Sequence, residues 1–319
     1  MNILVTGANG QLGKCIRDKV KSLGLNKETD NTYIYADVVG SDDADTEYLD
    51  ITDEEMVKNF VKKSNINVII NCAAYTNVDK AENDYETAEK LNAFGPKYLA
   101  EAAASVGAKL IHISTDYVFN GQTFFPYNEE RPTLPTSVYG KTKVMGEEFI
   151  QESGCKYLIF RTAWLYSEYG NNFVKTMLRL FNEKDELNVV NDQIGTPTYA
   201  GNLAQLIINI VEQTVVPEGR TVIPLVENGI YHFTDEGVCS WYDFACEIYH
   251  DDIELNDRIN GCTSSYVNIK GVTTKQYGSK TRRPYYSVLD KTKVKTDFPT
   301  SFIPRHWTDG VREVVRKII

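Results

Sequence analysis

Short apolar stretches alternate with longer amphipathic ones through the first half of the chain. In four stretches apolar residues recur at helical spacing: Gln11–Leu23, Met56 to Val61, roughly Tyr85–Val106 and about Thr136 to Ser153. Between them lie five apolar, β-branched stretches that predict strands: Asn2–Thr6, Tyr33–Val38, Val68–Ala73, Lys109–Ser114 and Tyr157–Thr162. Strands that alternate with helices predict a parallel sheet covered on both faces.

The alternation weakens after about Leu165. Two helix starts stand out there, a capping-box sequence at Ser240–Asp243 and the segment from His306 to Ile318; a similar box at Thr52–Glu55 precedes the helical spacing at Met56. We predict an α/β fold, a Rossmann-type doubly wound parallel sheet with a smaller C-terminal α/β substrate domain. Residues 1–165 with about 195–226 are expected in the first unit, and about 166–194 with 227–319 in the second. Gly24–Asn31 is expected to be a surface loop.

Charge and cysteine content narrow the class of protein. The 319 residues carry a net charge of −10, from 34 basic and 44 acidic side chains, which argues against nucleic acid and anionic membranes as partners. The first residues do not form a signal peptide, and no apolar run is long enough to cross a bilayer. Six scattered cysteines without a CxxC spacing argue against zinc and indicate a reducing compartment. We therefore expect a cytoplasmic protein.

A glycine-rich turn joins the first predicted strand to the first predicted helix. Its sequence is Gly7-Ala8-Asn9-Gly10-Gln11-Leu12-Gly13, and such glycines let a backbone turn tightly and approach a pyrophosphate. The helix start then offers free N–H groups and a favourable dipole. The spacing is GxxGxxG rather than the commoner GxGxxG, but the strand–turn–helix context predicts a dinucleotide site.

Acidic residues follow the next predicted strand. Asp37 closes that strand, where such a residue accepts hydrogen bonds from the adenosine ribose and repels a 2′-phosphate, so it favours NADH. The alternative is an ordinary turn aspartate. Asp50-Ile51 is expected to frame the adenine, although the pair is also the approach to the next helix.

Tyr139 and Lys143 stand four residues apart in a predicted helix and so share one face. A phenol with its ordinary pKa of about 10 is a usable acid at neutral pH, and a neighbouring ammonium is expected to lower that pKa. The pair suits proton transfer to or from a carbonyl oxygen while a hydride moves at the carbon, and Lys143 can also hold the nicotinamide ribose. The alternative is a surface tyrosine and lysine that share the spacing by chance.

Ser114-Thr115-Asp116 ends the fourth predicted strand, where open α/β sheets place their ligands. The hydroxyl of Thr115 can hydrogen-bond a substrate carbonyl, or it can simply cap a turn. The glycine turn, Thr115 and the Tyr139–Lys143 pair occur in the right order at the right structural positions, and this combination is far less frequent by chance than any one part.

These residues resemble the extended short-chain dehydrogenase/reductase family and, within it, the dTDP-4-dehydrorhamnose reductases. The resemblance covers nearly the whole chain. The matching stretches are Asn71–Thr76, Val78–Glu82, Ser114–Phe119, Tyr139–Lys143, Arg161–Trp164, Asn171–Phe173, Asn191–Thr198 and Arg282–Pro284. The VDKAE and DQIGTPT segments are the most specific to this group.

The resemblance implies reduction of the C4 keto group of dTDP-4-dehydro-L-rhamnose by NADH or NADPH, giving dTDP-L-rhamnose. Tyr139 would be the general acid, Lys143 its partner, and Thr115 and Asp116 would bind the sugar, with Trp164 packed against it and Arg283 in contact with the substrate. The cofactor would be lined by Gly7, Gly10, Gln11, Leu12, Gly13, Asp37, Asp50, Ile51, Ala73, Ala74, Tyr75, Thr76, Tyr139 and Lys143. Without the resemblance, Trp164 reads as a core residue and Arg283 as a surface charge.

Other members of the superfamily remain alternatives. Dehydratases carry glutamate where this chain has Tyr117, which argues against dehydration. An epimerase, a reductase of another nucleotide-linked keto-sugar and a non-catalytic regulatory homologue stay open. Some relatives bridge a dimer through magnesium held by a glutamate where this chain has Cys15, so we expect no such metal, and either a monomer or a homodimer.

Overall fold

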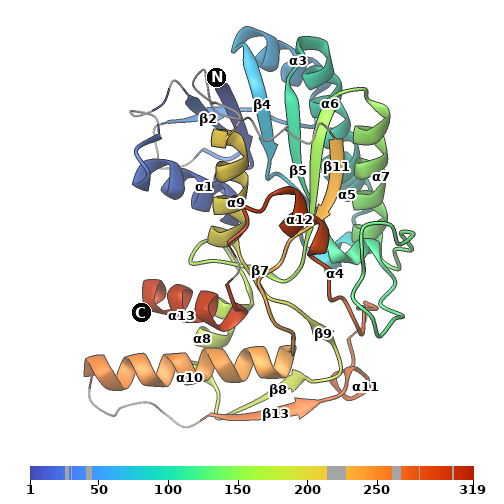
Figure 1. The fold of residues 1–319 in the computed structure, drawn as a ribbon. Helices are drawn as coiled ribbons and strands as arrows, with labels where there is room; N and C mark the ends of the chain where they lie inside the picture. The colour runs from blue at the N-terminus through green and yellow to red at the C-terminus, as the bar shows by residue number, and fades with distance from the viewer. Residues whose placement is uncertain are drawn as a thin grey trace.

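The computed structural model describes residues 1–25, 29, 31–40, 45–213, 228–260, 267–279, 281–303 and 305–319. Its main feature is a parallel sheet of seven strands in the order β11-β6-β5-β4-β1-β2-β3 (Figure 1). The strands are β1 (Asn2–Thr6), β2 (Thr32–Asp37), β3 (Thr46–Tyr48), β4 (Ile66–Asn71), β5 (Lys109–Thr115), β6 (Lys156–Thr162) and β11 (Asn228–His232). The predicted α/β fold is confirmed, and each of the five predicted strands is found within two residues of its expected ends.

Helices cover both faces because the strand side chains alternate between them. Ile3 and Val5 of β1 pack into one apolar cluster with α1 (Gln11–Ser22) and α9 (Ala200–Gln213). Leu4 points the other way, into a cluster formed with α3 (Glu54–Lys63), α6 (Gly95–Val106) and their neighbour α7 (Val138–Glu152). This two-sided burial explains why the strands are almost continuously apolar.

The helix expected at 85–106 is interrupted by a π turn. It consists of α5 (Tyr85–Glu89), the π segment η1 (Lys90–Phe94) and α6. The short helix α4 (Val78–Ala81) precedes it, and the 3₁₀ turn η2 (Asp116–Val118) follows β5. The prediction of a capping box that starts at Thr52 is wrong by one residue. The N-cap of α3 is Asp53, whose carboxylate accepts from the backbone N–H of Met56 at 2.9 Å.

A second packed region lies below the sheet in Figure 1. Its elements are α8 (Phe173–Glu183), α10 (Trp241–Asn260), α13 (Trp307–Ile318) and α11 (Thr274–Tyr277), with the strand pairs β8 (Glu186–Val190) and β13 (Asn268–Val272), β7 (Leu165–Tyr166) and β10 (Thr198–Tyr199), and β9 (Ile194–Gly195) and β12 (Cys239–Ser240). The short helix α12 (Thr292–Asp297) packs against β11 of the main sheet instead, and its Val294 joins the apolar cluster of β1, α1 and α9. The predicted box at Ser240 is present, since Ser240 and Asp243 hydrogen-bond each other's backbone N–H groups.

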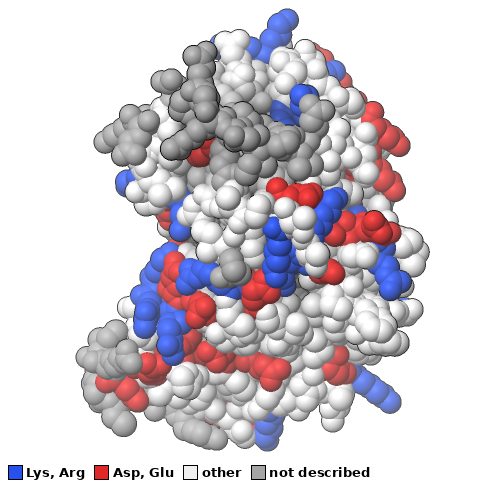
Figure 2. Space-filling model, viewed as in Figure 1, with Lys and Arg blue, Asp and Glu red and all other residues white. Residues whose placement is uncertain are grey.

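Charge complementarity joins the two long helices of this region. Arg312 of α13 donates to Asp251 at 3.0 Å and to Glu254 at 2.8 Å, both on α10. Figure 2 shows the corresponding acidic row along α10, with basic side chains above it over α13. Two acidic side chains of α10 are therefore paired with a basic side chain of the facing helix α13.

The division into two units stays a prediction, although β11, which the expected boundaries place in the second unit, pairs with β6 in the main sheet. Part of the expected loop at Gly24–Asn31 lies outside the described residues. Within the described ranges, no helix combines the length and apolar character needed to span a membrane.

Candidate active site

The glycine turn has the geometry that its sequence predicts. Gly7 adopts a φ of +63°, and a Cβ there would lie 2.5 Å from the backbone nitrogen of Ala73. A Cβ on Gly13 would lie 2.5 Å from the carbonyl oxygen of Gly7. Side chains at these two positions would therefore push β1, α1 and the end of β4 apart.

The start of α1 is free to bind an anion. Gly10 is its N-cap and supplies no side-chain hydrogen bond, and the first turn contains no acidic residue. Leu12 is buried in the core, so it offers only its backbone to a ligand. The side-chain oxygen of Gln11 accepts from Ser167 at 3.1 Å and from Asn172 at 2.9 Å, which ties the turn to the second region. These residues fit a dinucleotide pyrophosphate.

The predicted adenosine residues also have structural partners. The carboxylate of Asp37 accepts from the backbone N–H of Asn9 at 2.9 Å, so it supports the glycine turn directly. Asp50 accepts from the backbone N–H and the hydroxyl of Thr52, at 2.8 and 2.7 Å. Ile51 is buried, and a Cβ on Gly95 would lie 2.7 Å from its Cδ1. Each position can thus be explained by local structure as well as by a cofactor.

The segment after β4 is held in place by the π turn. Asn92 accepts from the backbone N–H of Tyr75 at 2.9 Å and donates to its carbonyl at 3.1 Å. Ala73 and Ala74 precede this anchor and are half-buried, and Thr76 follows it and is exposed. The hydrogen bonds to Asn92 therefore hold the backbone of residues 73–76 in one conformation next to the glycine turn. We call residues 73–76 the cofactor wall, because a bound cofactor would lie against them.

The predicted catalytic side chains meet at the carboxyl end of β5. The phenol of Tyr139 lies close enough to the Thr115 side chain for Thr115 to affect its pKa, and the hydroxyl of Thr115 donates to Asp116 at 3.0 Å. The hydroxyl of Thr115 also accepts from the backbone N–H of Tyr117, so the alternative role as a turn cap is present too. Asp116 is 2% exposed, and burial raises the pKa of its carboxyl to about 6. Its Oδ2 has no hydrogen-bond partner within the described residues, and Ser287 lies beside the same carboxyl.

Lys143 lies one turn further along α7 and is buried. Its Nζ donates to the carbonyl of Ile113 at 2.6 Å and lies 3.3 Å from Nε2 of His112. Loss of solvent around the ammonium lowers the pKa of Lys143 to about 8, against the opposing effect of Glu147.

The expected lowering of the pKa of Tyr139 is not found. Burial raises that pKa to about 12, and the neighbouring Thr115 side chain only partly offsets the loss of solvent. The Lys143 amine is directed at β5 instead, toward Ile113 and His112. A neutral phenol still fits the role of proton donor.

Three local features position α7. Ser137 caps the helix by accepting from the backbone N–H of Gly140 at 3.1 Å, and Glu82 of the VDKAE segment accepts from the N–H of Val138 at 2.8 Å. A Cβ on Gly140 would lie 2.3 Å from the carbonyl oxygen of Tyr117, so only glycine lets α7 approach η2 this closely. The YGK sequence therefore sets the distance between Tyr139 and the end of β5.

A buried ion pair lies behind this helix. The guanidinium of Arg161 donates to both oxygens of Glu147, at 2.6 to 3.2 Å, and Ser114 donates to the same carboxylate. Glu147 and Arg161 are 2% and 3% exposed. A bidentate pair of this kind is rigid, and removing one partner strands the other charge in the interior.

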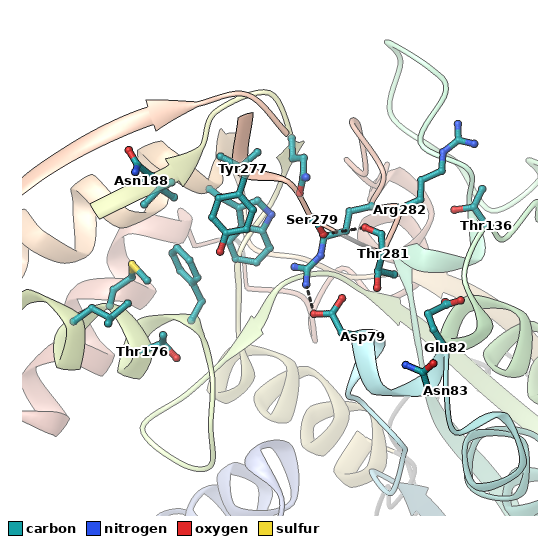
Figure 3. A pocket seen from close by; sticks show the side chains of 18 residues that line it. Asp79, Glu82, Asn83, Thr136, Thr176, Asn188, Tyr277, Ser279, Thr281 and Arg282 are labelled. Atoms are coloured by element: carbon teal, nitrogen blue, oxygen red, sulfur yellow. Dashed lines mark hydrogen bonds and ion pairs between the residues drawn. The ribbon is translucent and has the colours of Figure 1, made fainter. Parts of the chain in front are cut away.

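A pocket of about 970 Å³ opens between α4 with its flanking residues and the second region. Figure 3 shows Asp79, Glu82, Asn83 and Thr136 along one side, and Thr176, Asn188 and Tyr277 at the other end. Arg283 lines it and donates to Asp79 at 2.9 Å. Its far end is apolar, formed by Phe173, Met177, Leu180, Val189, Val190 and Trp241.

Only some of the residues predicted to bind the substrate line this pocket. Arg283 lines the pocket, whereas Thr115, Asp116 and Tyr139 lie outside its lining. The ring of Trp164 stacks on Trp241 at 3.7 Å between ring centres, and its φ of +49° is rare for a bulky residue. Trp164 therefore connects the end of β6 to the apolar end of the pocket.

Sequence reasoning missed His112, Asn71 and Glu147. Each is a polar residue in a stretch that otherwise reads as strand or helix core. A polar residue in a buried strand requires a hydrogen-bond partner, and that requirement was the available signal.

Comparison with known proteins agrees with this geometry. A family model described as the RmlD substrate binding domain matches residues 1–319. The dTDP-4-dehydrorhamnose reductase of Aggregatibacter actinomycetemcomitans is 39% identical over 312 residues, 98% of this chain and 97% of the relative. The chain belongs to the dTDP-4-dehydrorhamnose reductase family. This membership confirms the resemblance seen in the sequence.

Solved structures of the dTDP-4-dehydrorhamnose reductase family share the whole fold. The Clostridium acetobutylicum protein is 40% identical with a TM-score of 0.82, covering 100% of this chain and 99% of its own. The Bacillus anthracis protein, solved in complex with NADP, is 36% identical with a TM-score of 0.82 and covers 99% of each chain. The alignment therefore includes the glycine turn, the predicted catalytic residues and the pocket.

Proposed function

We propose that the chain reduces the C4 keto group of dTDP-4-dehydro-L-rhamnose to dTDP-L-rhamnose at the expense of NADH or NADPH. One observation carries the proposal: Tyr139, Thr115 and Lys143 converge at the carboxyl end of β5 in a chain similar over its full length to dTDP-4-dehydrorhamnose reductases. A reductase of another keto-sugar nucleotide uses the same group, so the substrate assignment rests on the family.

The proposed reduction adds one hydride and one proton. A bound NAD(P)H supplies the hydride to C4 of the sugar. Tyr139 donates its phenolic proton to the C4 oxygen, which Thr115 also contacts. The phenolate is then protonated again by the Lys143 ammonium, which recovers its proton from solvent. Because the pKa of Tyr139 is about 12, the phenol is fully protonated at neutral pH, as a donor must be.

The pocket supplies charge and apolar surface for a nucleotide-linked sugar. Arg282 and Arg283 line it together with Asp79 and Glu82, and Arg283 is paired with Asp79, so an anionic diphosphate would take the place of the Asp79 carboxylate on Arg283. The apolar end beside Trp241 and Phe173 suits a base, with Trp164 adjoining. The carboxylate of Asp116 would accept from a sugar hydroxyl.

The cofactor assignment follows from the same residues. Gly7, Gly10 and Gly13 with the open start of α1 fit a pyrophosphate, and a relative was solved with NADP. Asp37 favours NADH over NADPH because of its charge. We also propose the division into two units, and either a monomer or a homodimer in solution. Cys15 is buried, which argues against a dimer bridged by a metal at that position.

The test is NADH and NADPH oxidation at the absorbance maximum of the reduced cofactor, with dTDP-4-dehydro-L-rhamnose as substrate and product identification by chromatography. We expect substrate-dependent oxidation and formation of dTDP-L-rhamnose. Binding of NADH or NADPH without its oxidation in the presence of the substrate would contradict the proposal. Turnover with a different keto-sugar nucleotide alone would mean that the proposed reaction has that other substrate.

A further inference from the structure

A row of buried polar side chains runs from β1 to Lys143. Thr6 donates to Asn71 Oδ1 at 2.8 Å, Asn71 Nδ2 lies 3.0 Å from His112 Nδ1, and His112 Nε2 lies 3.3 Å from Lys143 Nζ. His112 is 0% exposed and Asn71 1% exposed. The row crosses β1, β4 and β5 and ends on the catalytic helix.

The backbone decides how the hydrogens are arranged. The N–H of Ala73 can only donate, and it lies 3.1 Å from Asn71 Oδ1, so that atom must be the amide oxygen. The amide nitrogen of Asn71 then donates to His112 Nδ1. A neutral imidazole that accepts on Nδ1 carries its proton on Nε2. Burial favours the neutral ring, because it lowers the pKa of His112 well below its ordinary value.

The Nε2–H of His112 therefore points at the amine of Lys143. Two donors facing each other are unfavourable, whereas an uncharged amine accepts the hydrogen bond with its lone pair and still donates to the carbonyl of Ile113. We propose that His112, oriented by Asn71, is a positioning residue that favours the uncharged form of the Lys143 amine and so sets the pH at which this lysine exchanges its proton. The kinetic consequence rests on the proposed reduction.

The other titratable groups around Lys143 do not replace this effect. Tyr139 and Glu147 lie on the same helix, Asp116 lies on η2, and Arg161 lies on β6. Glu147 acts in the opposite direction, toward the ammonium, but its charge is shared with Arg161 in the bidentate pair. His112 is the neighbour that presents a fixed N–H to the amine.

The imidazole tautomer is tested by ¹⁵N NMR of the whole protein labelled at histidine, assigned with His112→Phe. We expect the ¹⁵N chemical shift of a pyrrole-type nitrogen, which carries a proton, for Nε2 of His112. We expect the shift of a pyridine-type nitrogen, which carries none, for Nδ1. A proton on Nδ1 would overturn the inference. Asn71→Asp should move the proton to Nδ1, because a carboxylate accepts where the amide donated. This arm does not depend on catalytic activity.

The effect on Lys143 is tested by titrating its side chain with ¹³C-labelled lysine, assigned with Lys143→Met. His112→Phe keeps the site buried and removes the N–H, so the pKa of Lys143 should rise by about one unit. The alkaline limb of the kcat profile should rise with it, since reprotonation of Tyr139 needs the ammonium. His232→Phe, at a buried histidine bonded to the carbonyl of Tyr127 instead, should leave both unchanged.

A merely structural role for His112 would lower kcat or stability without moving either pKa, and that result would overturn the proposal. If the chain reduces no keto-sugar nucleotide, the ¹⁵N tautomer measurement and the ¹³C titration of Lys143 still decide the inference, so its failure is distinguishable from failure of the proposed function. If His112→Phe does not fold, the tautomer in the unaltered protein and the Asn71→Asp titration decide between the two roles.

Discussion

The ion pair behind Tyr139 is buried, whereas the ion pair at the pocket is largely exposed to solvent. Behind Tyr139, the side chains of Glu147 and Arg161 are 2% and 3% exposed and are joined by a bidentate pair. At the pocket, Asp79 and Arg283 form one hydrogen bond and are 59% and 33% exposed. Buried pairs are costly to break and fix geometry, whereas exposed pairs contribute little and separate readily. The catalytic side is therefore preorganised, and the pocket side can exchange its partners for a ligand.

The largest effect is expected on the preorganised side. Tyr139→Phe removes the proton donor and should lower kcat by about 10²- to 10⁴-fold while cofactor binding changes little. Steady-state kinetics and a fluorescence titration with NADPH measure the two quantities. Tyr117→Phe, which alters the ring packed edge-on against Tyr139 at 5.6 Å, is the matched control and should keep most of its turnover. A near-normal kcat for Tyr139→Phe would remove this residue from the acid role.

The buried pair should dominate stability. Glu147→Gln leaves the Arg161 charge without its counter-ion and should lower the free energy of unfolding by about 3–5 kcal/mol. Urea denaturation followed by circular dichroism gives the value. The control is Glu183→Gln, in the exposed pair with Arg179, which should cost less than about 1 kcal/mol. Equal losses in the two variants would show that burial does not distinguish the pairs.

Close packing under the catalytic helix should matter next. Gly140→Ala places a Cβ against the carbonyl of Tyr117, so α7 must shift, at a cost of about 1–3 kcal/mol and with reduced turnover. Thermal unfolding and kcat report the two effects. Gly40→Ala is a suitable comparison because its Cβ would meet nothing within 4 Å. An unshifted melting temperature for Gly140→Ala would mean that the helix–turn contact relaxes freely.

A smaller effect is expected at the cofactor site. Asp37→Ala should shift the ratio of kcat/KM values from NADH toward NADPH by about 1 kcal/mol, the interaction of two unit charges about 4 Å apart in water. Asp37→Asn removes the charge but keeps an acceptor for the N–H of Asn9. If charge decides the preference, both variants shift the ratio. An unchanged ratio in Asp37→Asn would assign the residue to the turn alone.

The smallest stability change is expected at the pocket. Arg283→Ala should alter the free energy of unfolding by less than about 1 kcal/mol, because the ion pair with Asp79 is exposed. The same variant should raise KM for the nucleotide-sugar and leave KM for the cofactor unchanged. Arg179→Ala, at another exposed pair, should change neither KM. A large loss of stability in Arg283→Ala would contradict the contrast between the two sides.

The sequence predicted what depends on local pattern. Strands β1, β2, β4, β5 and β6 follow from short apolar runs, and the glycine turn follows from its position between a strand and a helix. The approach of Thr115 to Tyr139 was expected from the family, and the structure brings the two side chains close enough for Thr115 to affect the pKa of Tyr139. These features are encoded within a few residues each.

What the sequence did not predict depends on distant partners. The place of β11 in the main sheet is set by its pairing with β6, which comes much earlier in the chain. The direction of the pKa of Tyr139 is set by the loss of solvent around it, which no spacing reveals. His112 read as part of a strand, because its partners Asn71 and Lys143 come from two other elements.

The π turn at Lys90–Phe94 limits how this segment can change in length. Asn92 within it bonds the backbone of Tyr75 and donates to Thr142, and its carbonyl oxygen is where a Cβ on Gly146 would collide, at 2.2 Å. Deleting one residue from the turn would restore an ordinary α-helix and rotate Asn92 by about 100°. Lineages of this family can therefore lose or gain a residue here only if the partners on the cofactor wall and on α7 change together.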